Sequence, residues 1–212
     1  MQNENQLSTM MYKAIFDEIT AHLISDHKPS TYIEKLSSME YFKEYLFSML
    51  HKLKTTEQSP KHHPEGSAWN HTMMVLDEAA KVRIKSSNQV VFMWSALLHD
   101  IGKPETTRNR KGKITSYDHD KVGEDLAIEF LKIFNLEQTF IDLVSAMVRY
   151  HMHILYILRK LPYADIENLL KRVDIYELAL LCLCDRLGRV KVNQESAERE
   201  YKEFLQMLTL SK

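Results

Sequence analysis

The sequence predicts an all-α protein, and three of its features favour that fold class. Only 5 glycines and 5 prolines interrupt the 212 residues, whereas a protein built from many short strands needs more turn residues. Leucine, methionine, glutamate and lysine are frequent, and all four are good helix formers. Apolar residues also recur at intervals of three or four, the spacing of one helix face. With 44% hydrophobic residues, the chain can bury a substantial core.

Residues 7–53 show the pattern of two or three amphipathic helices. One apolar stripe consists of Met11, Ile15, Ile19 and Leu23. Residues 41–53 carry another stripe, and neither is accompanied by residues that indicate chemistry. We therefore expect residues 1–58 to form a helical extension that packs on the core. We expect residues 59–212 to contain the core domain and, over about 195–210, an outer C-terminal helix.

A long apolar run, 90–98, ends in His99 and Asp100. The run lacks the bounding turns of a strand and predicts a buried helix. Burying a carboxylate beside an imidazole costs on the order of several kcal/mol unless a cation, a charged partner or water is present. A divalent metal would satisfy both side chains. The alternative is a His-Asp pair that faces solvent at a helix end, so the decision depends on further ligands.

Both ends of this helix are marked by residues that favour helix termini. Asn88 or Ser87 can cap its start. We expect Gly102 to supply the left-handed position that ends a helix, and Pro104 to prevent continuation. The two polar residues would then lie in the last turn, held in place by the packed helix behind them.

Two other predicted helices each carry one candidate ligand. His71 lies in the first turns of a helix expected over about 68–84, and Asp185 lies near the end of an apolar helix over 175–187. A single histidine near an apolar face is usually a satisfied core residue, and a lone aspartate can be an exposed cap. If the second helix is buried, however, the Asp185 charge needs a partner, which a metal beside His99 would supply.

Two more histidines adjoin predicted helices. His119 opens a helix that runs to about residue 134, and His151 follows a helix over about 137–149. The two cysteines, Cys182 and Cys184, lie two residues apart, a spacing that separates side chains on a helix. We interpret them as small core residues.

The polar stretch 105–118 includes Arg108 and Arg110 and has two interpretations of equal weight. Its Lys111-Gly112 pair is typical of a turn in a solvated loop. Alternatively, the stretch is a flap beside the metal that grips phosphate through guanidinium and ammonium groups.

The net charge of the chain argues against binding to a polyanion through a broad basic surface. A net charge of −1 predicts no extended surface for nucleic acid and none for an anionic membrane, so any nucleic-acid contact must be local. We find no signal sequence and no run of membrane-spanning length, and we expect a cytoplasmic protein. The oligomeric state stays open, because the apolar stripes can be covered within one chain or across a dimer.

The order His71, His99-Asp100, Asp185 resembles the HD-domain superfamily of metal-dependent phosphohydrolases. Further segments are similar to the HD domain attached to many bacterial CCA-adding tRNA nucleotidyltransferases: 60–66, 69–72, 97–104, 118–120, 151–152 and 184–189. The nucleotidyltransferase half has no counterpart here, so we expect no addition of nucleotides to tRNA. In that family glycine commonly precedes the third histidine, whereas this chain has Asp118.

The resemblance implies an HD-domain helical bundle with an N-terminal helical extension. It implies that one metal is bound by His71, His99, Asp100 and Asp185. It also implies that His119 and His151 hold a second metal, with Asp100 as the bridge. Such ligands suit manganese, iron, cobalt, nickel or zinc, and magnesium less. A metal in this setting activates water and polarises a phosphoryl oxygen.

The resemblance predicts a phosphohydrolase with Asp100 at its catalytic centre. Lys103 is placed to balance charge on the phosphate, or else is a solvated residue after the helix. We expect hydrolysis of a phosphomonoester or phosphodiester on a small nucleotide or an RNA end, with 2′,3′-cyclic phosphodiesterase and phosphatase activities first. One alternative is a nucleoside mono- or triphosphate hydrolase. Another is a non-catalytic module that senses a nucleotide or RNA end, with its metal coordination filled.

Overall fold

The computed structural model describes residues 2–43 and 47–211, and within them it confirms the all-α fold class. A two-stranded hairpin is the only sheet among these residues. The N-terminal helices are α1 (Gln2–Ser25), α2 (Ser30–Ser37), α3 (Glu40–Lys43), α4 (Ser48–His51) and the 3-10 helix η2 (Lys52–Thr55). Part of the apolar stripe predicted over 41–53 lies outside the described residues.

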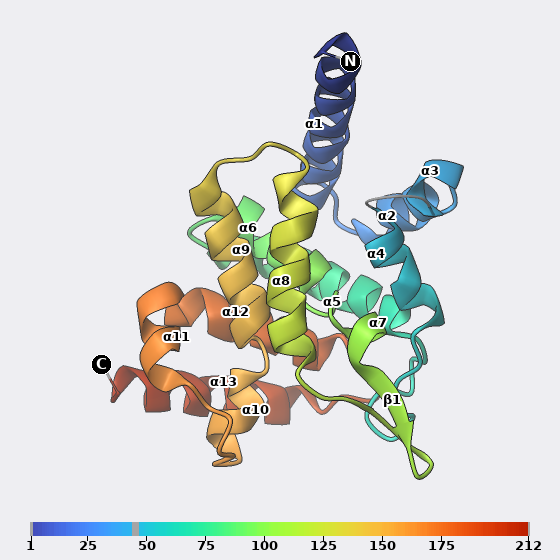
Figure 1. The fold of residues 1–212 in the computed structure, drawn as a ribbon. Helices are drawn as coiled ribbons and strands as arrows, with labels where there is room; N and C mark the ends of the chain where they lie inside the picture. Colours follow the sequence, from blue (N-terminus) through green and yellow to red (C-terminus); the bar gives the residue numbers. More distant parts are fainter. Residues whose placement is uncertain (1, 44–46, 212) are drawn as a thin grey trace.

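The remaining helices follow from residue 68 onward, and they share one hydrophobic core with the N-terminal helices. They are α5 (Ala68–Val82), the 3-10 turn η3 (Arg83–Lys85), α6 (Gln89–Leu98), α7 (Lys103–Thr106), α8 (His119–Lys132), α9 (Gln138–Tyr150), α10 (His153–Leu158), α11 (Ile166–Arg172), α12 (Ile175–Leu187) and α13 (Gln194–Thr209). Figure 1 shows α8 and α9 side by side, with α13 crossing beneath them near the C-terminus.

The helix α6 lies at the centre of the core, as its sequence predicts. Its residues from Val91 to Leu98 are all buried, and it packs against α1, α5, α9 and α12. The Asn88 side chain accepts a hydrogen bond from the Val91 amide and caps its start. Cys182 and Cys184 are buried free thiols in α12, which confirms their interpretation as core residues.

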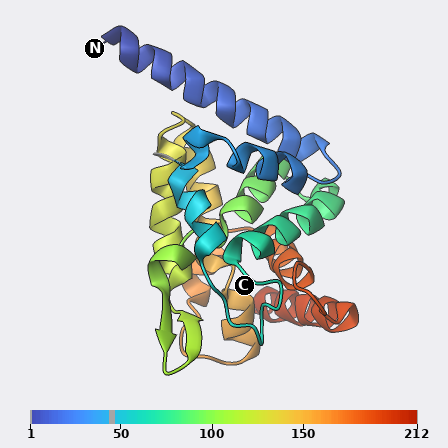
Figure 2. The same cartoon turned by 90° about the vertical axis from the view of Figure 1, so that its right-hand side faces the viewer.

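The first helix extends beyond the body of the molecule at its N-terminal end (Figure 2). Its contact with the core is aromatic and aliphatic. Phe16 stacks on Trp94 of α6 with ring centroids 4.6 Å apart, and Ile19 and Leu23 are buried. Met11, predicted to lie on the same stripe, is instead 55% exposed. The division of the chain at residue 58 stays a prediction.

Gly102 and Pro104 do not end the central helix in the predicted way. Gly102 has a right-handed backbone (φ −79°), and Pro104 lies in the first turn of α7. The reason for the glycine is a close approach to α8. A Cβ on Gly102 would lie 2.1 Å from the carbonyl oxygen of His119 and 2.6 Å from the amide nitrogen of Gly123. The chain after α6 therefore turns directly into α7 and packs its backbone on α8.

The polar stretch after Pro104 contains a β-hairpin. Strand β1 (Thr107–Arg110) pairs antiparallel with β2 (Lys113–Ser116). The connecting residues Lys111 and Gly112 have φ values of 53° and 78°, the positive values that a tight two-residue hairpin turn requires. The turn predicted at this pair is present, and two short strands flank it, which neither the loop nor the flap interpretation specified.

Within residues 2–43 and 47–211, no helix has both the length and the apolar character needed to cross a bilayer.

Candidate metal centre

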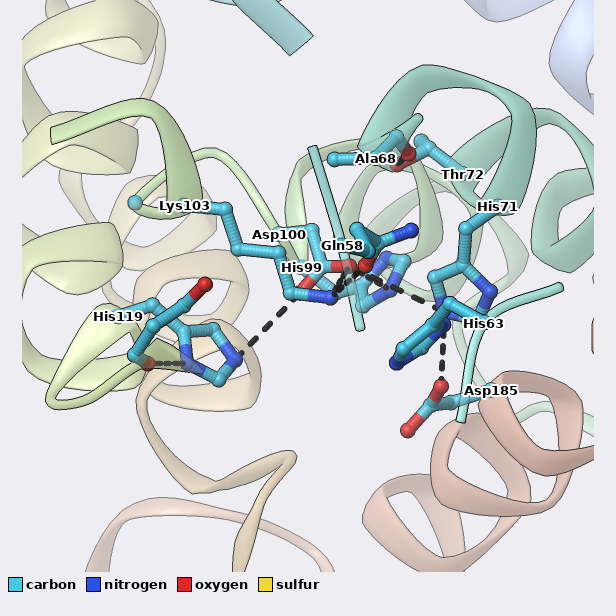
Figure 3. A network of polar contacts seen from close by, with 12 residues as sticks. Gln58, His63, Ala68, His71, Thr72, His99, Asp100, Lys103, His119 and Asp185 are labelled. Atoms are coloured by element: carbon cyan, nitrogen blue, oxygen red, sulfur yellow. Dashed lines mark hydrogen bonds and ion pairs between the residues drawn. The ribbon is translucent and has the colours of Figure 1, made fainter. Parts of the chain in front are cut away.

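The structure brings all six predicted metal ligands together at one end of the core. They are His71, His99, Asp100, His119, His151 and Asp185, and none is more than 6% exposed. Five of these side chains are labelled in Figure 3. Their common location follows from the helices, since His99 and His151 directly follow α6 and α9, and His119 is the first residue of α8.

One cluster gathers around the Oδ2 side of Asp100. The Nε2 atom of His99 lies 3.2 Å from Asp100 Oδ2, and His71 Nε2 lies 3.9 Å from the same oxygen. The His71 Nε2 atom also makes a 2.9 Å hydrogen bond with Asp185 Oδ1. Ligand atoms of His71, His99 and Asp100 lie within 4.8 Å of one another, a spacing that could hold one metal ion.

A second cluster gathers around the other oxygen of the same carboxylate. His119 Nε2 lies 3.5 Å from Asp100 Oδ1, and His151 Nε2 lies 3.8 Å from it. The two Nε2 atoms are 3.2 Å apart. These three residues could hold another ion, and Asp100 would then contact both through separate oxygens.

Three histidines turn the same nitrogen toward the centre. The Nδ1 atoms of His99, His119 and His151 contact the backbone carbonyls of Ala96, Ser116 and Val148 at 2.9, 2.7 and 2.6 Å. A carbonyl oxygen only accepts hydrogen bonds, so each Nδ1 carries the hydrogen and donates it. Each Nε2 is consequently left with a lone pair directed into the cluster, the arrangement typical of metal-binding histidines.

Buried lone pairs that face one another repel unless a cation lies between them. Whether these donors fit a metal therefore depends on their burial and protonation. His99 Nε2 is buried without a hydrogen-bond partner, next to a carboxylate oxygen. Burial lowers the pKa of His119 to about 4 and that of His151 to about 4, so neither ring is protonated at neutral pH. The nitrogen and oxygen donors present therefore fit a divalent transition metal.

The charges around Asp100 keep its carboxyl ionised. Burial alone would raise the pKa of Asp100, but His99 and Lys103 outweigh burial and hold it well below its ordinary value. For His99, burial lowers the pKa, yet the adjacent Asp100 carboxylate outweighs that effect and the net pKa is raised. An ionised Asp100 is the form that a metal requires as a ligand.

Lys103, predicted to balance charge on a phosphate, is buried within the cluster. Its Nζ lies 2.7 Å from Asp100 Oδ2 and donates a 2.5 Å hydrogen bond to Gln58 Oε1 (Figure 3). It is therefore not a solvated residue. Lys103 is also one of the residues that line the cavity beside the cluster.

Arg108 and Arg110 do not line that cavity. Both are exposed on the hairpin, where Arg108 donates to the Thr107 carbonyl oxygen and Arg110 to Thr115 Oγ1. The part of the hairpin that lines the cavity is strand β2, at residues 114–116. Their predicted role in binding substrate thus receives no support from their position.

Asp118 shows why glycine is common before the third histidine. Asp118 has a left-handed backbone with φ 59°, a conformation that glycine adopts freely and aspartate tolerates better than most residues. The departure from the family pattern therefore leaves the local backbone intact, and His119 still points to Asp100. His153, two residues beyond His151, is buried outside the cluster, where its Nε2 accepts a hydrogen bond from the Asp165 amide.

Sequence reasoning missed Glu65. Its carboxylate is 2% exposed, with Oε1 3.1 Å from His71 Nδ1 and 2.8 Å from His63 Nδ1. Burial raises its pKa, but contacts led by that with His71 outweigh burial and lower the pKa to about 2. The residue lies in the predicted motif 60–66, yet only the fold shows that its carboxylate faces His71. His63 lies beside His71 with ring centroids 4.7 Å apart.

A cavity of about 800 Å³ opens above the metal cluster. Sequence reasoning also missed the arginines along its wall, namely Arg159, Arg186, Arg189 and Arg199. Arg189 donates from one guanidinium nitrogen to both oxygens of Asp185, at 3.0 and 3.1 Å. No spacing in the sequence links these arginines, because they come from the end of α10, from α12 and the turn after it, and from α13.

An all-helical core that concentrates buried histidines and aspartates beneath a cation-lined cavity defines a metal-dependent enzyme of phosphate chemistry. The family model of the HD domain matches residues 68–189, which is more than half of the chain. This chain therefore belongs to the HD domain family and is a metal-dependent phosphohydrolase of the HD type.

Several curated relatives of this chain share one name. The chain is similar to the "Multifunctional CCA protein" of Pasteurella multocida, at 26% identity over 95% of this chain and 49% of the relative. Similar proteins of the same name come from Halorhodospira halophila (35% identity, 62% of this chain, 32% of the relative) and Hahella chejuensis (26%, 92% and 46%). The chain spans half or less of the length of these relatives.

Proposed function

We propose that this protein hydrolyses a phosphomonoester or phosphodiester on a nucleotide or an RNA end, with 2′,3′-cyclic phosphates as the first substrates to test. One observation carries the proposal: the two oxygens of Asp100 face separate groups of histidine Nε2 atoms at the floor of a cation-lined cavity. Two ions held this way would lie on either side of one carboxylate, the arrangement of two-metal phosphohydrolases.

In this proposal the first ion is held by His71, His99, Asp100 and Asp185, and the second by His119, His151 and Asp100. The ions are manganese, iron, cobalt, nickel or zinc, since nitrogen-rich sites favour these over magnesium. When bound, they supply Lewis acidity to a phosphoryl oxygen and an activated water.

The protein's own groups bind and orient the phosphate. Lys103 presents its ammonium group to a phosphate above Asp100. Arg189 holds Asp185 in place through charge-assisted hydrogen bonds from one guanidinium nitrogen to both carboxylate oxygens. The burial of the cluster excludes bulk water and strengthens each of these electrostatic contacts.

The names of the relatives support an RNA end as the substrate. Proteins called "Multifunctional CCA protein" align with up to 97% of this chain. The near-zero net charge supports contact with a local end rather than with a long duplex.

The test combines metal content with turnover. Protein purified without chelator is analysed for transition metals and assayed on a 2′,3′-cyclic nucleotide and on a nucleoside monophosphate, as wild type and as Asp100→Ala. We expect about two equivalents of metal and turnover in the wild type, with turnover lost in the variant. His151→Gln should lose the second equivalent only. The matched control is His153→Gln, a buried histidine two residues away that should keep both.

Two other results would contradict the proposal. If the protein binds metal but hydrolyses neither ester nor a nucleoside triphosphate, the proposed hydrolysis is rejected in favour of a non-catalytic module that senses a nucleotide or RNA end. Absence of metal after supplementation with manganese, nickel or zinc would overturn the metal site itself.

A further inference from the structure

The wall of the cavity carries more positive charge than its own carboxylates neutralise. Three of its five cations are paired: Lys103 with Asp100, Arg189 with Asp185, and Arg186 with Glu200 at 2.9 Å. The other two, Arg159 and Arg199, are exposed and make no ion pair with any described residue. Glu203 is the one lining carboxylate left, so two guanidinium groups face a single acid.

These two arginines, which we call the outer arginine pair, come from segments that pack together. Arg159 follows directly after α10, and Arg199 lies in α13. The helices α10 and α13 contact each other at the base of the molecule (Figure 1). Arg199 lies beyond the region 68–189 that the family model matches. Arg199 therefore adds a cation to the cavity from outside the matched region, whereas Arg159 lies within it.

The same cavity has an apolar side next to these cations. Leu155 lines it and is 41% exposed, and Leu158 and Ile114 line it as well. An apolar surface beside guanidinium groups suits a nucleobase attached to a phosphodiester, since bases stack on guanidinium planes and against apolar side chains. At about 800 Å³, the cavity is in the upper part of the range of roughly 300–1,000 Å³ found for sites of organic ligands. It has room for more than one phosphate group.

We propose that the outer arginine pair binds an internucleotide phosphate while the terminal phosphate lies at the metal centre. The enzyme then prefers the end of an oligonucleotide, with at least two phosphates, over a mononucleotide. This inference rests on the proposed function, since it names which form of that substrate the cavity selects.

The first test compares two substrates that differ by one nucleotide. Adenosine 2′,3′-cyclic phosphate and an adenylyl dinucleotide ending in the same cyclic phosphate are assayed with wild type, Arg159→Gln, Arg199→Gln and the double variant. We expect the wild type to favour the dinucleotide in kcat/KM by about tenfold or more, and each substitution to remove a large part of that preference. The mononucleotide rate should stay within about twofold.

Lys202→Gln is the matched control, because Lys202 lies in α13 near Arg199, is exposed and does not line the cavity. It should keep the preference. Equal rates for the two substrates in the wild type, or equal losses on both in the arginine variants, would overturn the proposal.

A binding measurement separates this inference from the proposed function. Calorimetry gives the affinity of the wild type and the double variant for adenosine 3′-phosphate and for the dinucleotide with a 3′-phosphate. If no ester is hydrolysed, the proposed function fails. The outer site is then still supported by tighter dinucleotide binding that the double variant loses, and refuted by equal affinities.

Discussion

Which ring nitrogen carries the hydrogen determines which nitrogen of each histidine can bind a metal. Three of them donate Nδ1–H to a backbone carbonyl and so keep an Nε2 lone pair for the ion. His71 differs, because its Nδ1 faces the Glu65 carboxylate instead. When Nε2 binds a metal, the hydrogen must sit on Nδ1, where the negative charge of Glu65 stabilises it.

Glu65→Gln should therefore weaken metal binding without removing a ligand. We expect a 10- to 100-fold loss of affinity for the first ion, the usual effect of removing such a partner. The measurement is competition with a chelator of known affinity. Glu57→Gln is the control, since its carboxylate is exposed on the same segment. Unchanged affinity in Glu65→Gln would show that this carboxylate does not orient His71.

At the scale of elements, the contact between α7 and α8 places the two metal clusters together. The backbone at Gly102, two residues after Asp100, packs on the carbonyl of His119. This contact sets how closely His119 approaches Asp100 Oδ1. A glycine is needed because no side chain, however small, fits between the two backbones.

Gly102→Ala should consequently separate the two elements. Its added methyl group has no free space, and we expect a loss of about 1–3 kcal/mol in the free energy of unfolding, measured with urea. Retention of the second metal should fall more than that of the first. Gly112→Ala is the comparison: its Cβ meets nothing within 4 Å, so this variant carries turn strain but should keep both metals. Equal effects on the two metals in Gly102→Ala would contradict this account.

At the scale of the whole molecule, the metal centre joins segments that are far apart in the chain. Its six predicted ligands span residues 71 to 185 and come from α5, α8 and α12 and from the turns after α6 and α9. Ions bound by these ligands would favour the folded over the unfolded chain, because the unfolded chain does not hold the ligands together.

Metal removal should therefore lower the thermal stability of the entire protein. At a free metal concentration about 100 times Kd, binding contributes ~2.7 kcal/mol, so chelator should reduce Tm and re-addition of metal should restore it. Differential scanning calorimetry measures the shift. In Asp100→Ala the response to metal should be largely lost. A Tm that does not depend on metal in the wild type would contradict a role of the ion in linking these helices.

The helices were accessible from the sequence because their signals are local. The apolar periodicity, the cap at Asn88 and the apolar run after Ile175 each act within a few residues, and α12 begins and ends where the pattern predicts. Asp100 and Asp185 were accessible as candidates because a carboxylate on a buried apolar helix is costly without a partner. The other candidate ligands, above all His119 and His151, came from the resemblance to the HD-domain superfamily. That their side chains meet was an expectation, and the structure places them within contact.

Tertiary structure alone decided the roles of Gly102, Glu65 and the cavity arginines, because the residues that each of them contacts or joins lie far apart in the chain. Gly102 is required by α8 rather than by its own turn, and Glu65 matters because α5 places His71 against it. The arginines of the cavity come from the turns after α10 and α12 and from α12 and α13, whereas those predicted from sequence lie on the outside of the hairpin. Residue type and spacing specify helices and candidate chemistry, but the packing of distant helices determines which side chains share a cavity.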